Sequence, residues 1–233
     1  MACRQIKAIY RLKQSPRAWY SRIHRFFQAH DFRRSPHDDS LYINYGKQVI
    51  LLLHVDALVV AAPTKALVSW IQTKFHDEFE MTDLGLLQTF LELEIARTRT
   101  KQTLHLSQSQ YIQNVLRTHS LESGNPLQTL ADTHVRIKKP SPVAEATPEA
   151  RGQYQSAVGS VMYGMLGSRH ELANEVLKVS RFSTNPVTTH WTVVKQIFGQ
   201  LVRTQNRGLC YESHGSGPGC TDPDGVSSYV SRI

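Results

Sequence analysis

Asp56 is a lone carboxylate inside an otherwise apolar run, and this placement is the first sign of chemistry in the sequence. The run covers residues 49 to 62 and contains one other polar residue, His54. A carboxylate supplies the hard oxygen ligands that Mg²⁺ and Mn²⁺ prefer, so metal binding is one interpretation. An ordinary turn residue is the other, because the aspartate side chain forms local hydrogen bonds that stabilise turns.

A second group with possible chemistry, Lys13, Gln14 and Arg17, surrounds a predicted helix start. The dipeptide Ser15-Pro16 is typical of such a start, with Ser15 as N-cap and Pro16 at the first helical position. Cations beside a helix N-terminus suit phosphate groups. A capped amphipathic helix with a basic, solvated face is the alternative interpretation.

The composition favours an anionic partner. The chain has 233 residues, 40% of them hydrophobic, and a formal charge of +8. Nucleic acid is the commonest meaning of such a charge, ahead of a membrane surface, and an inert basic surface is the alternative. The 3 cysteines form no C-x-x-C pair, so neither a disulfide scaffold nor a structural metal site is predicted. With no visible signal peptide and no apolar run long enough to cross a bilayer, we expect no membrane segment and an intracellular location, cytoplasm or nucleus.

Two helices and three strands are predicted to position Asp56. Residues 41–45 and 48–54 indicate two strands about a turn, and 58–62 a third, with 55–57 as a tight connection. An amphipathic helix is expected from Ser15 to near His30, and another follows Thr64, which can act as its cap.

Further along the chain, periodicity predicts a hairpin, a short helix and then more helices. The hairpin is expected from strands Phe90–Ala96 and Thr103–Leu106, with the short helix around 111–116. Prolines in the stretch 123–152 indicate a linker. Helical apolar stripes resume at 154–165 and 191–201 and are most simply core. The order of elements predicts an α+β fold.

Five stretches in fixed order resemble one known family. The stretches AIYRLKQSPRAWY, LLLHVDALVV and FEMTDLGLLQTFLELEI are similar to palm motifs of reverse transcriptases from copia-type retrotransposons. The stretches GSVMYGMLGSR and SRFSTNPVTTHWTVVKQIF resemble the region that joins this polymerase to its ribonuclease H. The resemblance implies a partial reverse-transcriptase palm, an antiparallel sheet with packed helices, followed by a helical thumb and connection segment. The implied divisions are a palm and thumb remnant (1–122), the linker (123–152), a helical connection (153–206) and a truncated ribonuclease H start (207–233).

The resemblance also implies a chemistry. The family is RNA-directed DNA polymerase, which acts on an RNA or DNA template-primer and deoxynucleoside triphosphates with Mg²⁺ or Mn²⁺. Two adjacent aspartates occupy the turn of its palm hairpin, where this sequence has Asp56 and Ala57. A further aspartate of the family belongs to a motif expected upstream of Cys3. Since Ala57 offers no oxygen ligand, we expect this chain to be catalytically inactive.

Other residues take their expected roles from the same resemblance. It implies that Lys13, Gln14 and Arg17 contact phosphate and base. Glu92 stands where the hairpin that resembles the primer grip has glycine, and a carboxylate there would repel phosphate. Asp222 resembles the first metal-binding aspartate of the ribonuclease H domain.

Four hypotheses remain open from the sequence. The leading one is a degenerate, inactive reverse transcriptase fragment. An active polymerase complemented by a missing upstream segment is the second, and a non-catalytic basic nucleic-acid binder is the third. The fourth is a chain that does not fold stably, because the Asp56 hairpin would have an unpaired edge and an uncovered apolar face.

Overall fold

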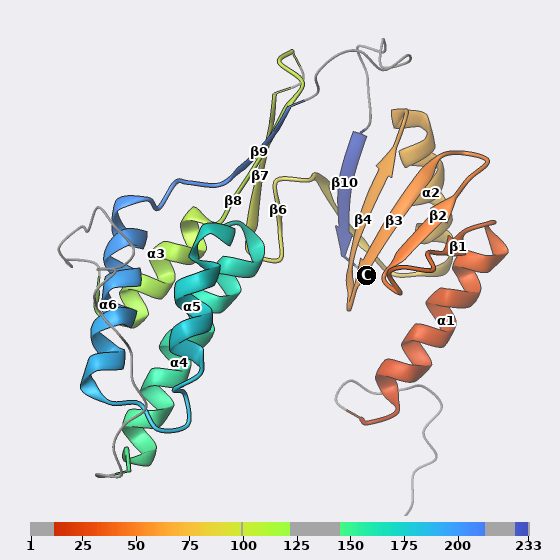
Figure 1. Cartoon of the computed structure of the whole chain (residues 1–233). Helices are drawn as coiled ribbons and strands as arrows, with labels where there is room; N and C mark the ends of the chain where they lie inside the picture. Colours follow the sequence, from red (N-terminus) through yellow and green to blue (C-terminus); the bar gives the residue numbers. More distant parts are fainter. Residues whose placement is uncertain (1–11, 99, 122–144, 213–226, 233) are drawn as a thin grey trace, which may run out of the picture. The chain divides into compact units, whose positions relative to one another are not determined.

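The computed structural model describes residues 12–98, 100–121, 145–212 and 227–232, the last of these by their backbone only. The chain divides into two compact units, one made of residues 1–87 and 216–233 and the other of residues 88–215 (Figure 1). Each unit has its own sheet and its own hydrophobic core.

The first unit is built on a 6-stranded antiparallel sheet. Its strands lie in the order β1 (Arg33–Arg34), β2 (Leu41–Asn44), β3 (Val49–His54), β4 (Ala57–Ala62), β10 (Ser227–Arg232) and β5 (Thr82–Leu86). The three strands predicted around Asp56 are thus confirmed as β2, β3 and β4. Strand β4 begins one residue earlier than predicted because Ala57 already pairs with His54.

Helices α1 (Ser15–Ala29) and α2 (Lys65–Glu78) pack on one face of this sheet. Side chains alternate between the two faces of a strand, so every second residue of β3 and β4 points into the core. The core residues from the strands are Tyr42, Val49, Leu51, Leu53, Leu58, Val60 and Ala62, and those from the helices include Ile23, Phe26, Phe27, Val68, Ile71 and Phe75. Burial of each large apolar side chain stabilises the folded state by about 1.5–3 kcal/mol. Because these core residues lie on one side of the hairpin, this stabilisation determines which face of the hairpin stays outside the core.

The two helix starts differ in how well the sequence predicted them. Ser15 is the first residue of α1, and Gln14 is its N-cap without a side-chain cap hydrogen bond, so the prediction of Ser15 as N-cap is wrong by one position. The predicted cap of α2 is confirmed, since the Thr64 hydroxyl accepts a hydrogen bond from the backbone N–H of Leu67 at 3.4 Å.

Both edges of the β3–β4 hairpin are paired. Strand β2 pairs with β3, and β10 pairs with β4 along its whole length, from Ala57 to Ala62. The expectation of an unpaired edge is therefore wrong. Local sequence patterns do not reveal the pairing of β4 with β10, because β10 is distant from β4 in the chain. The outer face of β3 keeps an exposed apolar side chain, Ile50 at 41%, so the expected uncovered apolar face stays a prediction.

The second unit combines a 4-stranded antiparallel sheet with a group of helices. The sheet order is β6 (Thr89–Phe90), β7 (Leu93–Thr98), β8 (Thr103–Ser107) and β9 (Leu209–Glu212). The helices are α3 (Ser109–Thr118), α4 (Pro148–Gly167), the 3₁₀ helix η1 (His170–Leu172), α5 (Ala173–Ser180) and α6 (Thr188–Arg203). The apolar stripes predicted at 154–165 and 191–201 are confirmed as core residues of α4 and α6.

The predicted hairpin of this unit is confirmed as β7 and β8, but its first strand begins at Leu93 and not at Phe90. Residues 90–96 form two strands, β6 and β7, with a turn at Leu91 and Glu92, whose φ angles are 51° and 61°. No glycine marks this turn in the sequence. The hydroxyl of Tyr163 donates a hydrogen bond to the carbonyl of Leu91 at 2.9 Å and so holds the turn from a distant helix.

The observed mixture of helices and antiparallel sheets confirms the α+β class. Helix α4 begins at Pro148, within the range predicted as a linker, while residues 122–144 lie outside the described part of the chain. The functional divisions at 122, 152 and 206 stay predictions. Within the described residues, no helix is both long enough and apolar enough to cross a membrane.

Candidate functional site: the Asp56 turn

Val55 and Asp56 form the tight turn between β3 and β4, and His54 pairs with Ala57 across it. Val55 has a φ of 56°, the sign that a type II′ hairpin turn requires at its first central residue, where glycine is usual. A β-branched residue in this region is strained, at a cost on the order of 1–3 kcal/mol. The paired strands on both sides therefore impose the turn on an unfavourable residue.

Ala57 lies on the face of the sheet that points away from α1 and α2. Its neighbour Leu58 is in the core, and successive side chains of a strand point to opposite faces. Because His54 and Ala57 are direct cross-strand partners, their side chains share this outer face. A carboxylate at position 57 would consequently lie beside both His54 and the adjacent Asp56.

Trp19 on α1 anchors the turn. Its indole N–H donates a hydrogen bond to the carbonyl of Val55 at 2.9 Å, and its ring meets Phe79 edge-on at a centroid distance of 5.6 Å. Helical periodicity places Trp19 on the apolar face of α1 but does not reveal this contact with a residue 36 positions away. The sequence hints at this hydrogen bond only through the residue type, since the N–H of a half-buried tryptophan usually has a hydrogen-bond partner.

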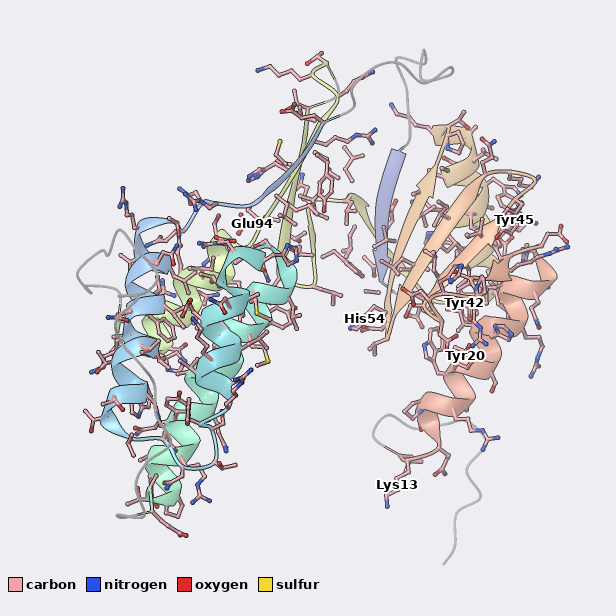
Figure 2. All side chains as sticks on the ribbon, in the orientation of Figure 1. Lys13, Tyr20, Tyr42, Tyr45, His54 and Glu94 are labelled. Atoms are coloured by element: carbon pink, nitrogen blue, oxygen red, sulfur yellow. The ribbon has the colours of Figure 1, made fainter. Side chains whose placement is uncertain are left out.

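The predicted phosphate-binding residues Lys13, Gln14 and Arg17 are all exposed at the start of α1. The first turn of this helix contains no acidic residue, so the positive end of the helix dipole and the cations Lys13 and Arg17 add to one another. Since Trp19 touches the turn, the helix start lies at the Asp56 end of the sheet, and Figure 2 labels Lys13 and His54 at this end. Asp222 lies outside the described residues.

Arg22, five residues beyond Arg17 on α1, has partners within the protein. Its guanidinium donates to the backbone carbonyl of Glu78 at 3.0 Å and to the Glu78 carboxylate at 3.1 Å. It also lies 5.1 Å from the centroid of the Phe79 ring. Helix α1 therefore contains a partnered arginine, Arg22, and an exposed arginine, Arg17.

The residues at the turn do not fit a centre of two metal ions. Transfer of a nucleotide by two divalent ions needs several carboxylate oxygens to neutralise and place them. In the described part of the chain, no group of three or more His, Cys, Asp or Glu side chains could hold a metal ion. Position 57, next to Asp56, contributes a methyl group instead of a ligand.

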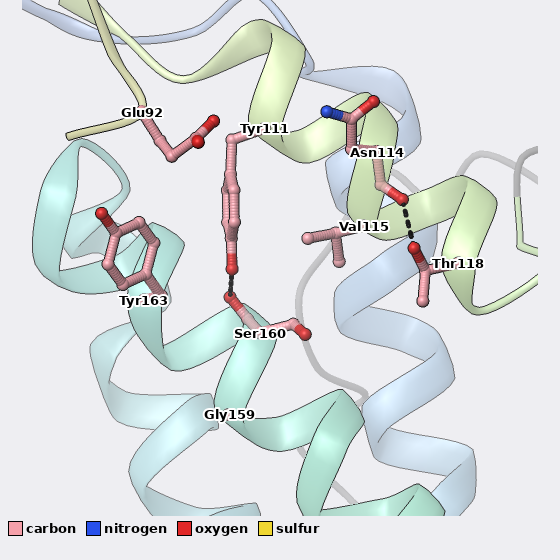
Figure 3. A pocket seen from close by; sticks show the side chains of 8 residues that line it. All are labelled: Glu92, Tyr111, Asn114, Val115, Thr118, Gly159, Ser160 and Tyr163. Atoms are coloured by element: carbon pink, nitrogen blue, oxygen red, sulfur yellow. Dashed lines mark hydrogen bonds between the residues drawn. The ribbon is translucent and has the colours of Figure 1, made fainter. Parts of the chain in front are cut away.

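Glu92 lines a pocket in the second unit (Figure 3). This cavity of about 540 Å³ is formed by the β6–β7 turn and by helices α3 and α4. Tyr111 donates a hydrogen bond to the carbonyl of Ser160 at 3.0 Å, and its ring lies 5.0 Å from that of Tyr163. The exposed carboxylate of Glu92 makes this pocket unsuited to phosphate, in agreement with the charge argument from the sequence.

Comparison with known proteins gives a consistent result. Residues 1–131 match the family model described as reverse transcriptase (RNA-dependent DNA polymerase). The chain is 36% identical to the retrovirus-related Pol polyprotein from transposon TNT 1-94 of Nicotiana tabacum, over 96% of the chain and 17% of that relative. It is 29% identical to the corresponding polyprotein from transposon RE2 of Arabidopsis thaliana, over 89% of the chain and 14% of the relative.

The chain therefore spans less than a fifth of the length of these relatives, at 17% and 14%. No solved structure matches it significantly. The family match covers more than half of the chain and includes the helix start, the Asp56 turn and the β6–β7 region. The chain belongs to the reverse transcriptase (RNA-dependent DNA polymerase) family, in the form carried by the Pol polyproteins of copia-type retrotransposons.

Proposed function

We propose that this chain forms palm and thumb parts of a copia-type reverse transcriptase whose metal-binding turn no longer supports nucleotide transfer. The first unit corresponds to the palm, because its antiparallel sheet carries the Asp56 turn and two helices cover its inner face. Helices α3 to α6 correspond to the thumb and connection. Residues 207–233 correspond to the start of the ribonuclease H domain.

The observation that carries this proposal is the pairing of His54 with Ala57 across the turn. It puts a methyl group where the second carboxylate of an aspartate pair would lie. One carboxylate at the turn leaves most of the charge of two divalent ions uncompensated. Loss of a partner that only orients a ligand costs about 10–100-fold in metal affinity or activity, so loss of a ligand should cost more.

Manganese binding tests the ligand argument directly. The variant Ala57→Asp should bind Mn²⁺ at least about 10-fold more tightly than the native chain, measured by electron paramagnetic resonance titration. Ala57→Asn is the matched control, since it has nearly the same shape without the charge. Equal Mn²⁺ affinity of the Asp and Asn variants would show that position 57 is not the missing ligand.

Primer extension tests the catalytic conclusion. With Mg²⁺ or Mn²⁺, a template-primer and deoxynucleoside triphosphates, the native chain should incorporate no nucleotide. Incorporation that disappears in Asp56→Asn would refute the proposal and support an active polymerase. The same assay with a fingers segment of a related polymerase joined to the native chain and to Ala57→Asp tests complementation, and extension is expected only with Ala57→Asp.

Nucleic-acid binding without catalysis is a second candidate function, supported by the exposed cations at the start of α1. Lys13 and Arg17 would contact phosphates, with Gln14 beside them. Arg17→Gln should reduce the slope of log affinity against log salt by about 0.7 for single strands. Arg22→Gln is the matched control because Glu78 already binds the Arg22 guanidinium. Equal effects of the two substitutions would exclude a specific role for the helix start.

A further inference from the structure

A basic cavity lies at the end of β3 that is remote from Asp56. It has a volume of about 840 Å³ and is lined by residues from the end of α1, from β1 and from the β2–β3 turn. We name it the β2–β3 pocket. Strand β3 has 6 residues, so at about 3.4 Å per residue the first and last residues of the strand lie roughly 17 Å apart. The β2–β3 pocket is therefore separate from the metal turn.

The charge of the pocket lining favours an anion. Its cations are Arg33, Arg34 and Lys47, against one acid, Asp31. Arg34 is partly neutralised, because it lies 3.2 Å from the carboxylate of Asp39. Arg33 is exposed and forms no ion pair with any residue that the structure describes. Two cations, Arg33 and Lys47, are thus available to an incoming phosphate.

The Lys47 side chain and its turn are held in place. The ammonium of Lys47 lies 5.0 Å from the centroid of the Trp70 ring, a cation–π contact that restricts the side chain. The buried side chain of Asn44 accepts a hydrogen bond from the backbone N–H of Lys47 at 2.9 Å and donates one to the carbonyl of His30 at 3.1 Å. The turn is thereby fixed to the end of α1, which reduces the entropy lost on binding.

Tyr45 gives this turn an exposed aromatic surface. Its side chain is 64% exposed although it lies between the buried Asn44 and the anchored Lys47 (Figure 2). Tyr45 lines the same cavity as the cations Arg33 and Lys47, and unpaired bases stack on such exposed rings in proteins that bind single strands. A duplex keeps its bases stacked on one another and cannot use Tyr45 in this way.

We propose that the β2–β3 pocket binds single-stranded nucleic acid, with Arg33 and Lys47 contacting phosphates and Tyr45 stacking on a base. This site goes beyond the proposed binding at the start of α1, since it uses other residues at the other end of the sheet. The β2–β3 pocket would give the first unit a contact with a nucleic-acid strand away from the Asp56 turn.

Salt-dependent binding of a short labelled oligothymidylate to the full chain tests the phosphate contacts. Loss of two contacts in the double variant Arg33→Gln, Lys47→Gln should reduce the log–log salt slope by about 1.4. At about 0.1 M salt this corresponds to roughly 25-fold weaker binding. The matched control is Arg181→Gln, Arg207→Gln, which removes the same charge from exposed positions of the second unit. Equal slopes in the two double variants would overturn the proposal.

The stacking contact has its own pair of variants. Tyr45→Ala should weaken binding by about 5- to 160-fold, whereas Tyr45→Phe should keep the native affinity, since stacking on one base contributes about 1–3 kcal/mol. Equal affinities of the Ala and Phe variants would overturn the stacking assignment. Circular dichroism of each variant verifies that the fold is unchanged.

Two further arms separate this site from its alternatives. Thymidine monophosphate should compete only weakly, because it offers one phosphate and one base. Displacement of the oligomer by the monophosphate at comparable concentration would indicate a mononucleotide site and overturn the proposal. The proposal would also be overturned if Arg17→Gln lost binding while the Arg33→Gln, Lys47→Gln double variant kept the native affinity. That result would leave the proposed function intact.

Discussion

Replacement of Val55 by glycine should stabilise the first unit by about 1 kcal/mol. Val55 has a φ of 56°, and the left-handed region costs a residue with a Cβ roughly 1–2 kcal/mol, with the higher value for a branched side chain. Glycine removes this strain but loses more backbone entropy on folding, which offsets roughly 0.5–1 kcal/mol. The side chain of Val55 is 70% exposed, so its removal sacrifices little apolar burial. The hydrogen bond from Trp19 goes to the backbone carbonyl and survives the change.

Urea denaturation followed by fluorescence measures this effect, since Trp19 and Trp70 both lie in the first unit. The midpoint should rise in Val55→Gly and change little in Val55→Ala, because alanine still has a Cβ at positive φ. Val55→Asn should fall between these two, since asparagine tolerates this region better than other residues with side chains. A Val55→Gly protein that is less stable than the native chain would show that the turn is not strained.

Three further predictions concern other contacts. Trp19→Phe should destabilise the first unit by about 0.5–1.5 kcal/mol, because it removes the hydrogen bond to Val55 but keeps a ring against Phe79. A urea titration followed by far-UV circular dichroism measures this change. An unchanged midpoint would show that the hydrogen bond from Trp19 does not stabilise the turn. Arg169→Met should destabilise the second unit by about 3 kcal/mol. The fully buried guanidinium of Arg169 donates hydrogen bonds to the Glu171 carboxylate at 2.7 Å and to the Thr204 carbonyl at 3.1 Å, and the variant loses both. A melting temperature within about 1 °C of the native value would contradict this prediction. Burial lowers the pKa of His119, so the unfolded chain binds a proton at this residue more tightly than the folded chain, and the free energy of unfolding should fall as the pH drops below about 6.5. The decrease in the free energy of unfolding between about pH 7.5 and 5.5 should be smaller in His119→Gln than in the native chain. An equal decrease in the two proteins would contradict this prediction.

The hairpin around Asp56 could be predicted from the sequence because its signals are local. Alternation of apolar residues in β2 and β3 depends on neighbours two positions apart, and the periodic stripes of α1 and α2 depend on neighbours three and four positions apart. The cap Thr64 is also a local feature. The predicted start of α1 is wrong by one residue, because Ser15 favours the N-cap position but lies inside the first turn.

The turn at Leu91 and Glu92 could not be predicted, since neither residue favours positive φ. A hydrogen bond from Tyr163 to Leu91 holds it, and the two residues are far apart in the chain. The pairing of β10 with β4 is missed for the same reason. Contacts of this kind depend on the packed fold, which short patterns of residues do not specify.

The sequence alone determined the family, the α+β class and the absence of a second aspartate at the turn, because residue types and their order are enough for these conclusions. Only the tertiary structure decided that Ala57 faces His54 on the outer face, that Trp19 anchors the turn, and that β10 covers the edge of β4. It alone also brought Arg33, Tyr45 and Lys47 together around one cavity. These features join residues that are distant in the chain, and long-range packing, not local propensity, sets their distances.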